Sequence, residues 1–323
     1  MWSAAKTSLC VLLLFQTATL GAEPVASNEP ERTPRLTVAT TRFDGIDLMT
    51  LDVYGKDAVR ETRDPKGAVG PTWSPDGKRL AFASYRTGRG QVFVIDAEGK
   101  ESNLTSSTAF ERNPAWSPDG KAIAFCGDRA GSQAVWLMDA DGSNQQELTT
   151  MGNFNCDPTW SPDGKRLAFV SGRSGGNRLW LMNADGSEPT NLVPQNEIGA
   201  LYPTWSADGK QIVYGSQAEN RTVQLFVVNV DGSGRQQLTK GERSNSYAAW
   251  SPDGQYIAYI RFVRWPGSLD PTSRPDPDLP PADLVVYDTV SDQHTTISTG
   301  DISMWGPRPS WKPTASQVGA KQP

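Results

Sequence analysis

Short apolar segments alternate with polar turns along most of this chain, and one unit shows the pattern. Residues 114–116 and 122–125 are predicted to be strands joined by a Ser-Pro-Asp-Gly turn at residues 117–120, where proline, aspartate and glycine each suit their turn position. Residues 135–138 are apolar throughout, as expected for a strand covered on both faces. A fourth strand is expected at residues 147–149, after an Asp-Gly-Ser turn. The pattern predicts a four-stranded antiparallel unit.

This unit returns with a nearly constant spacing. Trp-Ser-(Pro/Ala)-Asp-Gly occurs five times, at Trp73, Trp116, Trp160, Trp205 and Trp250, with gaps of 43, 44, 45 and 45 residues. A sixth, degraded copy begins at Trp311. A fixed period of about 40–45 residues, dense in strand and turn signals, is typical of a β-propeller, in which each repeat supplies one blade.

The number of strands predicts six blades and a way to close the ring. The strand that ends at the repeated Trp occurs six times, and so does the set of three strands that follows it. The first such set, within residues 36–62, precedes any Trp strand, and the last Trp strand, residues 309–311, has no set after it. We therefore expect an all-β, six-bladed propeller over residues 36–313, with the C-terminal strand completing the N-terminal blade and residues 314–323 forming a tail. Closure hides sheet edges that would otherwise favour aggregation.

One predicted blade carries an insertion over about residues 261–283. It contains Arg264, Trp265 and a proline-rich run at residues 271–281. Long loops without secondary structure of their own are often functional. A binding flap and a plain insertion are both open interpretations.

The first 22 residues are typical of a secretory signal peptide. Lys6 precedes an apolar run at residues 9–15 that is too short to span a bilayer, and small residues up to Ala22 suit cleavage there. Cys10 lies inside the apolar run, so we expect no lipid anchor at this cysteine. We expect a periplasmic or secreted chain that does not span the membrane, with residues 23–35 as a short segment before the propeller.

The charge of the chain argues against a nucleic-acid partner. The formal net charge is −5, the isoelectric point is about 5.1, and no basic stretch is available to neutralise phosphates.

Two cysteines remain after the predicted cleavage site. Cys126 is expected at the end of a blade's second strand, and Cys156 in the linker that enters the next blade. An oxidising compartment permits a disulfide between them. Because spacing alone does not give connectivity, two unpaired small residues are the favoured interpretation.

The sequence offers little catalytic chemistry. Its only histidine, His294, has no evident partners for a Ser-His-Asp or Cys-His arrangement. Residues 172–176 match Gly-x-Ser-x-Gly, but they fall at a predicted turn and not at the strand-to-helix elbow that this motif needs. The repeated turn aspartates, such as Asp119, are interpreted as scaffold. We expect no catalytic residue, no metal and no cofactor.

Binding is expected on one rim of the ring. The turns between second and third strands share this rim with the linkers between blades, and both vary in length, charge and aromatic content, as binding loops on a rigid scaffold do. The candidate binding residues are Arg86, Phe110, Arg112, Asn113, Arg129, Phe154, Asp157, Arg173, Tyr202, Tyr247, Trp265 and Trp305. Local pairing is the favoured alternative for the arginines, and plugging of the blade ends is an equal alternative for the aromatics.

The full repeat, Pro-x-Trp-Ser-Pro-Asp-Gly-Lys-x-(Ile/Leu)-Ala-Phe, then an Arg-x-Gly turn, an apolar strand ending in Asp-Gly-Ser, and Leu-Thr, resembles the propeller repeat of the TolB family. The resemblance covers nearly the whole predicted mature chain. It implies a periplasmic, protein-binding propeller of the Tol-Pal envelope system. By the same resemblance, the partner would be similar to the peptidoglycan-associated lipoprotein. Members of the family carry an α/β domain ahead of the propeller, and contacts made by that domain are not expected here.

Three functions stay open on these grounds. The favoured one is a monomeric, non-catalytic module that binds a protein or peptide, in envelope integrity or periplasmic protein transport. The second is a propeller lyase or hydrolase acting on cell-wall or carbohydrate substrates. The third is the propeller partner of a protease whose catalytic domain is a separate chain, since related repeats form the propellers of tricorn-type and prolyl-oligopeptidase-type proteases.

Overall fold

The computed structural model describes residues 33–43, 45–129, 131–152, 154–194, 199–262, 282–302 and 308–314. For residues 299–302 it describes the backbone alone. The predicted leader, most of the insertion with Trp265, and Trp305 lie outside these residues. Glu31–Pro323 forms one compact unit. In the described part of the chain there is no helix, and so none that could cross a membrane.

The described strands form six antiparallel blades, as the repeat count predicts. Blade 1 comprises β4 (Ala68–Trp73), β5 (Leu80–Ser84), β6 (Gln91–Ile95) and β7 (Glu101–Asn103). Blade 2 comprises β8 (Glu111–Trp116), β9 (Ala122–Gly127), β10 (Ala134–Asp139) and β11 (Gln146–Glu147). Blade 3 comprises β12 (Asn155–Trp160), β13 (Arg166–Ser171), β14 (Arg178–Asn183) and β15 (Thr190–Asn191). Blade 4 comprises β16 (Leu201–Trp205), β17 (Gln211–Gln217), β18 (Val223–Asn229) and β19 (Gln236–Gln237).

The last two blades are continuous with each other. Blade 5 comprises β20 (Asn245–Trp250), β21 (Tyr256–Phe262), β22 (Ala282–Asp288) and β23 (Gln293–Ile302). Blade 6 comprises β24 (Ser310–Lys312), β1 (Arg35–Phe43), β2 (Gly45–Asp52) and β3 (Val59–Arg60). β23 also pairs with β1 at Thr40 and Ile302, which joins the two blades into one sheet.

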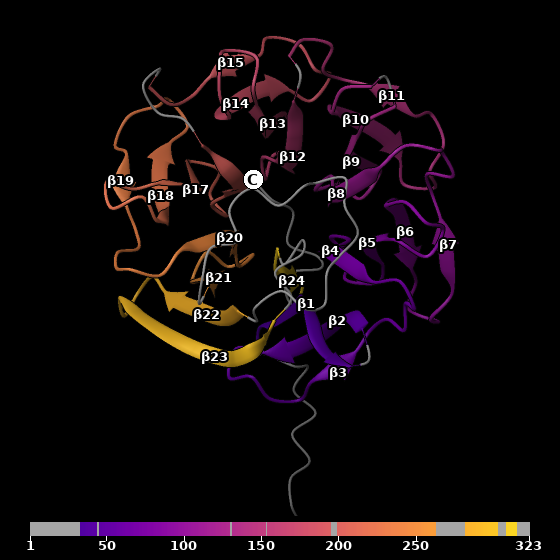
Figure 1. Cartoon of the computed structure of the whole chain (residues 1–323), viewed down its shortest axis with the longest axis horizontal. Coiled ribbons are helices and arrows are strands. Elements are labelled where there is room, and N and C mark those ends of the chain that lie inside the picture. The colour runs from indigo at the N-terminus through magenta and orange to yellow at the C-terminus, as the bar shows by residue number, and fades with distance from the viewer. Residues whose placement is uncertain are drawn as a thin grey trace, which may run out of the picture. The chain divides into compact units, whose positions relative to one another are not determined.

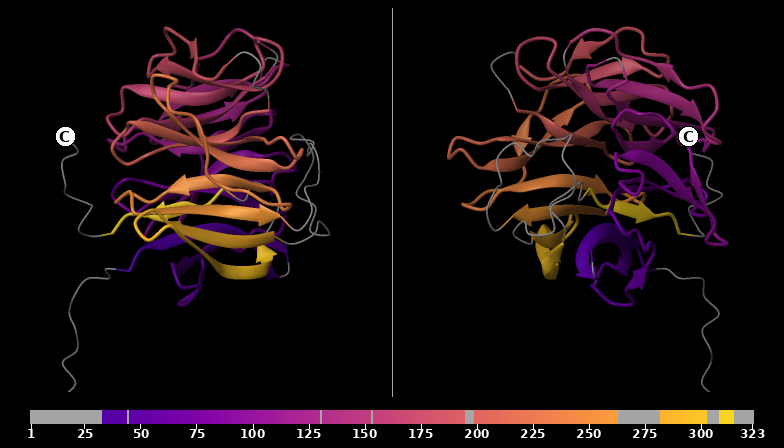
Figure 2. Two further views of the ribbon diagram at one scale, coloured as in Figure 1. Left: turned by 90° about the vertical axis from the view of Figure 1, so that its left-hand side faces the viewer. Right: turned by 45° about the vertical axis from the view of Figure 1, so that its right-hand side comes forward.

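Ring closure follows the predicted route. The C-terminal strand β24 pairs antiparallel with the N-terminal strand β1, with Leu36 opposite Trp311. The innermost strands β4, β8, β12, β16, β20 and β24 each contact the next around the ring, and β24 contacts β4 again. Figure 1 shows the inner strands around the centre and the outer strands, all short except β23, at the periphery. In the side views the strands run across the thickness of the ring, so the turns collect on two opposite rims (Figure 2).

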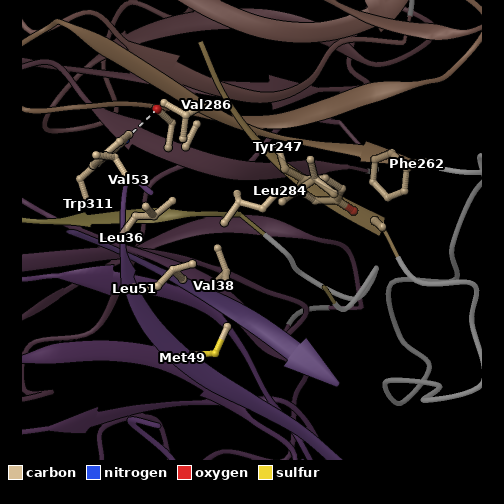
Figure 3. Close-up of a cluster of buried hydrophobic side chains, with 14 residues drawn as sticks. Leu36, Val38, Met49, Leu51, Val53, Tyr247, Phe262, Leu284, Val286 and Trp311 are labelled. Carbon is tan, nitrogen blue, oxygen red and sulfur yellow. Dashed lines mark hydrogen bonds between the residues drawn. The ribbon is translucent and has the colours of Figure 1, made fainter. Parts of the chain in front are cut away.

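The repeated Trp connects three of the inner strands to the inner strand before them. The indole Nε1 atoms of Trp160, Trp205 and Trp311 donate to main-chain carbonyls of the preceding inner strand, at 3.1, 3.1 and 2.9 Å. Trp311 also packs in an apolar cluster between blades 5 and 6, with Leu36, Leu51 and Val286 among its members (Figure 3). The degraded sixth repeat therefore makes the same contact as the complete repeats at Trp160 and Trp205.

The Ser-Pro-Asp-Gly turns are scaffold, as interpreted from their repetition. In blade 2, the Ser117 hydroxyl donates to the Asp119 carboxylate at 2.6 Å and accepts from the Ala122 amide at 2.9 Å, while Gly120 takes a φ of +69°. The Ser117 hydrogen bond is the main cause that holds the pKa of Asp119 below its usual value. The carboxylates of these aspartates therefore stabilise the turns.

The structure joins Cys126 of β9 to Cys156 of β12 in a disulfide, with the two Cα atoms 5.1 Å apart. The expectation of two unpaired cysteines is therefore wrong. Cys156 lies inside the inner strand of blade 3, not in a linker, and the packing of blade 3 on blade 2 brings it beside the end of β9. A spacing of 30 residues carries no information about that packing.

Candidate functional site

Five of the inner strands share one irregularity. Their pairing with the next strand shifts register at a bulge that lies three residues before the repeated Trp. The residues at this position are Gly70, Asn113, Asp157, Tyr202 and Tyr247, with φ of +60°, +53°, +56°, +48° and +55°. β-Bulges of this kind redirect a side chain away from the regular sheet pattern.

The local sequence explains where the bulge forms. In four of the five strands the next residue is proline (Pro71, Pro114, Pro158 and Pro203), which has no N–H and is confined to sheet edges and bulges. Asn and Asp tolerate left-handed φ, whereas a tyrosine in this region costs about 1–3 kcal/mol. Two adjacent blades carry that cost, at Tyr202 and Tyr247. Strained non-glycine residues of this kind cluster at functional sites.

The bulge side chains contact one another around the centre. Asn113 Nδ2 donates to Asp157 Oδ1 at 2.5 Å, and the Tyr202 amide also donates to the Asp157 carboxylate. The rings of Tyr202 and Tyr247 stack at 3.9 Å, and their hydroxyls are 3.1 Å apart. Gly70 has no side chain, and a Cβ at this position would meet Asn113, with Oδ1 the nearest atom at 3.5 Å.

The sixth position is filled from blade 6 by Arg308, three residues before Trp311. Its Nη2 donates to the carbonyl of Pro203 at 3.0 Å, and its Nη1 lies 3.5 Å from the carbonyl of Pro158. Those acceptors belong to blades 4 and 3, across the ring from blade 6. We refer to Gly70, Asn113, Asp157, Tyr202, Tyr247 and Arg308 as the central ring.

Burial sets the protonation tendencies in the central ring. It raises the pKa of Asp157, against the opposing charges of Arg112 and Arg308. It lowers the pKa of Arg308 and raises the pKa of the Tyr202 and Tyr247 hydroxyls, which stay neutral at physiological pH. Within the described residues, no carboxylate lies within ion-pairing distance of Arg308.

The predicted binding residues therefore divide into groups. The structure places Asn113, Asp157, Tyr202 and Tyr247 in inner strands, and not in the linkers where the sequence suggested them. Arg112 lies beside Asn113 on β8, where its Nη2 donates to Gln133 Oε1 at 2.9 Å. Five of the candidates are thus brought together at the centre.

The rim arginines are each held within their own blade. Arg129 Nε donates to the fully buried Glu111 at 2.6 Å, and its guanidinium lies 4.5 Å from the Trp136 ring centre. Arg86 pairs in the same way with Asp64 and Glu101 and covers Phe93. Arg173 covers Trp180 and donates to Asn155 Oδ1 at 3.1 Å. Their contacts agree with the local-pairing interpretation.

Phe110 and Phe154 lie in linkers on the same rim as the turns. The Phe110 amide donates to Asp128 Oδ1 at 2.7 Å, and the Phe154 carbonyl accepts from the Gly172 amide at 2.9 Å. These bonds tie each linker to the turn between the second and third strands of the following blade. Trp265 and Trp305 lie outside the described residues.

His294 is far from this arrangement in the fold, on the peripheral strand β23. Its ring stacks on Tyr287 at 4.4 Å between ring centres, and its Nδ1 is 3.2 Å from the Tyr259 hydroxyl. Partial burial lowers its pKa below the usual value. Among the described residues no group of three or more His, Cys, Asp or Glu side chains is placed to hold a metal ion.

Sequence reasoning missed Arg308 and Gly70. The signal was present, because both stand three residues before a repeated Trp and directly before a proline. Aligning that single column across all six repeats would have found the central ring.

Comparison with known proteins agrees with the fold. The TolB beta propeller domain matches residues 46–158 and 153–264, together more than half of the chain. The chain belongs to this family. Within it, residues of this chain are 39% identical over 59 positions to the Tol-Pal system protein TolB of Syntrophus aciditrophicus, a match that spans 18% of this chain and 13% of that protein.

Solved TolB structures share the fold at lower identity. The crystal structure of TolB from Acinetobacter baumannii aligns with a TM-score of 0.71 at 21% identity, covering 87% of this chain and 67% of that one. The structure of putative TolB from Agrobacterium tumefaciens aligns with a TM-score of 0.67 at 19% identity, covering 87% and 97%. The sequence match to the TolB of Syntrophus aciditrophicus spans well under two thirds of that relative's length, and at these identities the solved structures establish the fold alone.

Proposed function

We propose that this chain is an exported, non-catalytic propeller that binds a protein partner at the central ring, approached from the rim of linkers and Arg-x-Gly turns. One observation carries the proposal. Four consecutive blades hold non-glycine residues at left-handed φ, and their side chains contact one another where the inner strands converge. By family membership, the partner would be similar to a peptidoglycan-associated lipoprotein, in envelope integrity or periplasmic protein transport.

The bulge itself does not require these side chains. Blade 1 forms the same bulge with Gly70 and pairs its strands in the same register. Tyrosine at this position therefore adds strain that the bulge does not need, which favours a role in binding, although Tyr247 also packs in the apolar cluster between blades 5 and 6. Tyr and Arg are the residue types that dominate binding energy at protein interfaces.

The test fills the one vacant position of the central ring. Gly70→Asn places an amide there, and asparagine tolerates the φ of +60°. We expect at least a ten-fold loss of affinity for the soluble domain of the same organism's peptidoglycan-associated lipoprotein, measured by titration calorimetry, because the added side chain blocks the centre.

Gly120→Asn is the matched control. Gly120 has a φ of +69°, and a Cβ there would meet Pro75 Cδ at 3.6 Å, much as at Gly70, but it lies in a turn on the opposite rim. This variant should bind normally. Equal losses in both variants, or in neither, would contradict a partner site at the central ring.

A further inference from the structure

Two arginines stand at the centre of this acidic chain, Arg308 in the central ring and Arg112 beside it. Arg308 reaches into it from blade 6, and Arg112 stands beside Asn113 close enough to influence Asp157, Tyr202 and Tyr247. Asp157 is the one carboxylate among the six ring positions. The chain as a whole has a formal net charge of −5. A guanidinium held in a site walled by protein attracts ligands of the opposite sign.

The hydrogen bonds of Arg308 leave its charge without a carboxylate partner in the described part of the chain. Its two acceptors are the neutral carbonyls of Pro158 and Pro203, at 3.5 and 3.0 Å. A guanidinium has more N–H donors than these two acceptors use. Its planar fork matches a carboxylate in a bidentate fashion, and such charge-assisted bonds are roughly twice as strong as neutral ones.

Asp157 does not neutralise Arg308 by contact. Its carboxylate accepts instead from Asn113 and from the Tyr202 amide. Gly70 carries no side chain in blade 1, which adjoins blade 6. The ring therefore has one position that adds no side chain to compete with a ligand, while the Arg308 guanidinium lies toward blades 3 and 4.

We propose that the central ring recognises a carboxylate of its partner, with Arg308 as the group that binds it and an acidic peptide segment as the ligand. This inference rests on the proposed function and names the chemistry of the same site. The carboxylate can come from an acidic side chain or from a chain terminus, and the peptides below separate these two sources.

Asp157 should oppose the ligand when it is ionised. The charged and titratable groups that face it are Arg112, Arg308, Tyr202 and Tyr247. As the pH falls toward the raised pKa of Asp157, its repulsion of a ligand carboxylate is lost, and affinity should rise while the ligand stays ionised. Asp157→Asn should bind several-fold more tightly than the unmodified chain near pH 7 and should flatten this pH dependence.

The experiment uses three short peptides and the full propeller, with calorimetry as the readout. The first is a capped peptide of alternating Glu and Gly, the second its Gln counterpart with an amidated end, and the third the Gln counterpart with a free carboxyl end. We expect the Glu peptide or the free-end peptide to bind and the amidated Gln peptide to fail. Equal binding of all three, or binding of none, would overturn the proposal.

Arg308→Met should lower the affinity for the binding peptide at least ten-fold. Arg79→Met is the matched control, since Arg79 also donates to a main-chain carbonyl of another blade, that of Gly120 at 3.4 Å, but on the opposite rim. Arg308→Lys keeps the positive charge but loses the planar guanidinium that binds a carboxylate in bidentate fashion. Thermal melting checks that each variant folds. Should Arg308→Met unfold, the opposite effect of Asp157→Asn still decides, because tighter binding is expected only if an anion occupies the ring.

The two proposals fail differently. If the lipoprotein domain binds and Gly70→Asn abolishes that binding, while the acidic peptides and Arg308→Met show no effect, the carboxylate inference is wrong and the proposed function stands. If Gly70→Asn leaves the lipoprotein affinity unchanged, the proposed function itself is wrong.

Discussion

At the scale of single residues, similar side chains on the rim have different surroundings. Arg129 and Arg173 occupy equivalent turns and stack on equivalent rings, Trp136 and Trp180. Arg129 neutralises the fully buried carboxylate of Glu111, whereas Arg173 donates to the neutral amide of Asn155. Removing one partner of a buried ion pair leaves an uncompensated charge, and removing a neutral hydrogen bond does not.

This difference gives a stability prediction. Arg129→Ala should lower the free energy of unfolding by about 3 kcal/mol, because Glu111 would be left buried without its counter-charge. Arg173→Ala should cost about 1 kcal/mol, the scale of a neutral hydrogen bond. Urea unfolding monitored by tryptophan fluorescence measures both. Equal costs would show that Glu111 does not depend on Arg129 for its charge balance.

At the scale of elements, the three-residue strand β24 completes a blade that begins at the other end of the chain. Trp311 contributes to the apolar cluster between blades 5 and 6, and its indole donates to the carbonyl of Ala249. Ser310 Oγ accepts from the Trp73 amide at 3.1 Å, which connects β24 to blade 1 as well. The element is short but contacts both neighbouring blades.

Truncation tests this closure. A chain ending at residue 307 lacks β24 and should lose about 3–5 kcal/mol of stability, the range for removing one large buried aromatic side chain. It should also aggregate more readily, because β1 would present an open inner edge. A chain ending at Thr314 keeps β24 and is the control. If both truncated chains melt at the same temperature, β24 does not close the ring.

At the scale of the whole molecule, the ring is held by repeated contacts between blades and by one covalent link. The disulfide of Cys126 and Cys156 joins blade 2 to blade 3 directly behind the central ring, where Asn113 Nδ2 lies 3.9 Å from Cys156 Sγ. Such a bond persists in oxidising compartments, which agrees with the proposed export.

Reducing this disulfide should therefore lower the stability of the fold. Closing a loop with a sequence separation of 30 is worth about 2–4 kcal/mol. Reductant should lower the free energy of unfolding by that amount in the unmodified chain. In the double variant Cys126→Ala, Cys156→Ala it should change nothing. A chain insensitive to reductant in urea unfolding would mean that the two thiols are not joined in solution.

The sequence by itself determined the period, the blade number and the closing strand. Each of these depends on local signals, a strand pattern and a turn chemistry that return about every 44 residues. It also supplied Asn113, Asp157, Tyr202 and Tyr247 as binding candidates, because aromatic and polar residues in variable segments are typical of binding loops. It placed them in linkers, since a bulge inside a strand leaves no pattern in hydrophobicity.

Only the tertiary structure decided what meets at the centre. Arg308 contacts carbonyls that lie 105 and 150 residues away in the chain, and Cys126 meets Cys156 in the next blade. Such contacts depend on the curvature and closure of the whole ring, to which every blade contributes. No local sequence pattern contains this information. Which residues face each other across the ring is therefore known only from the complete structure.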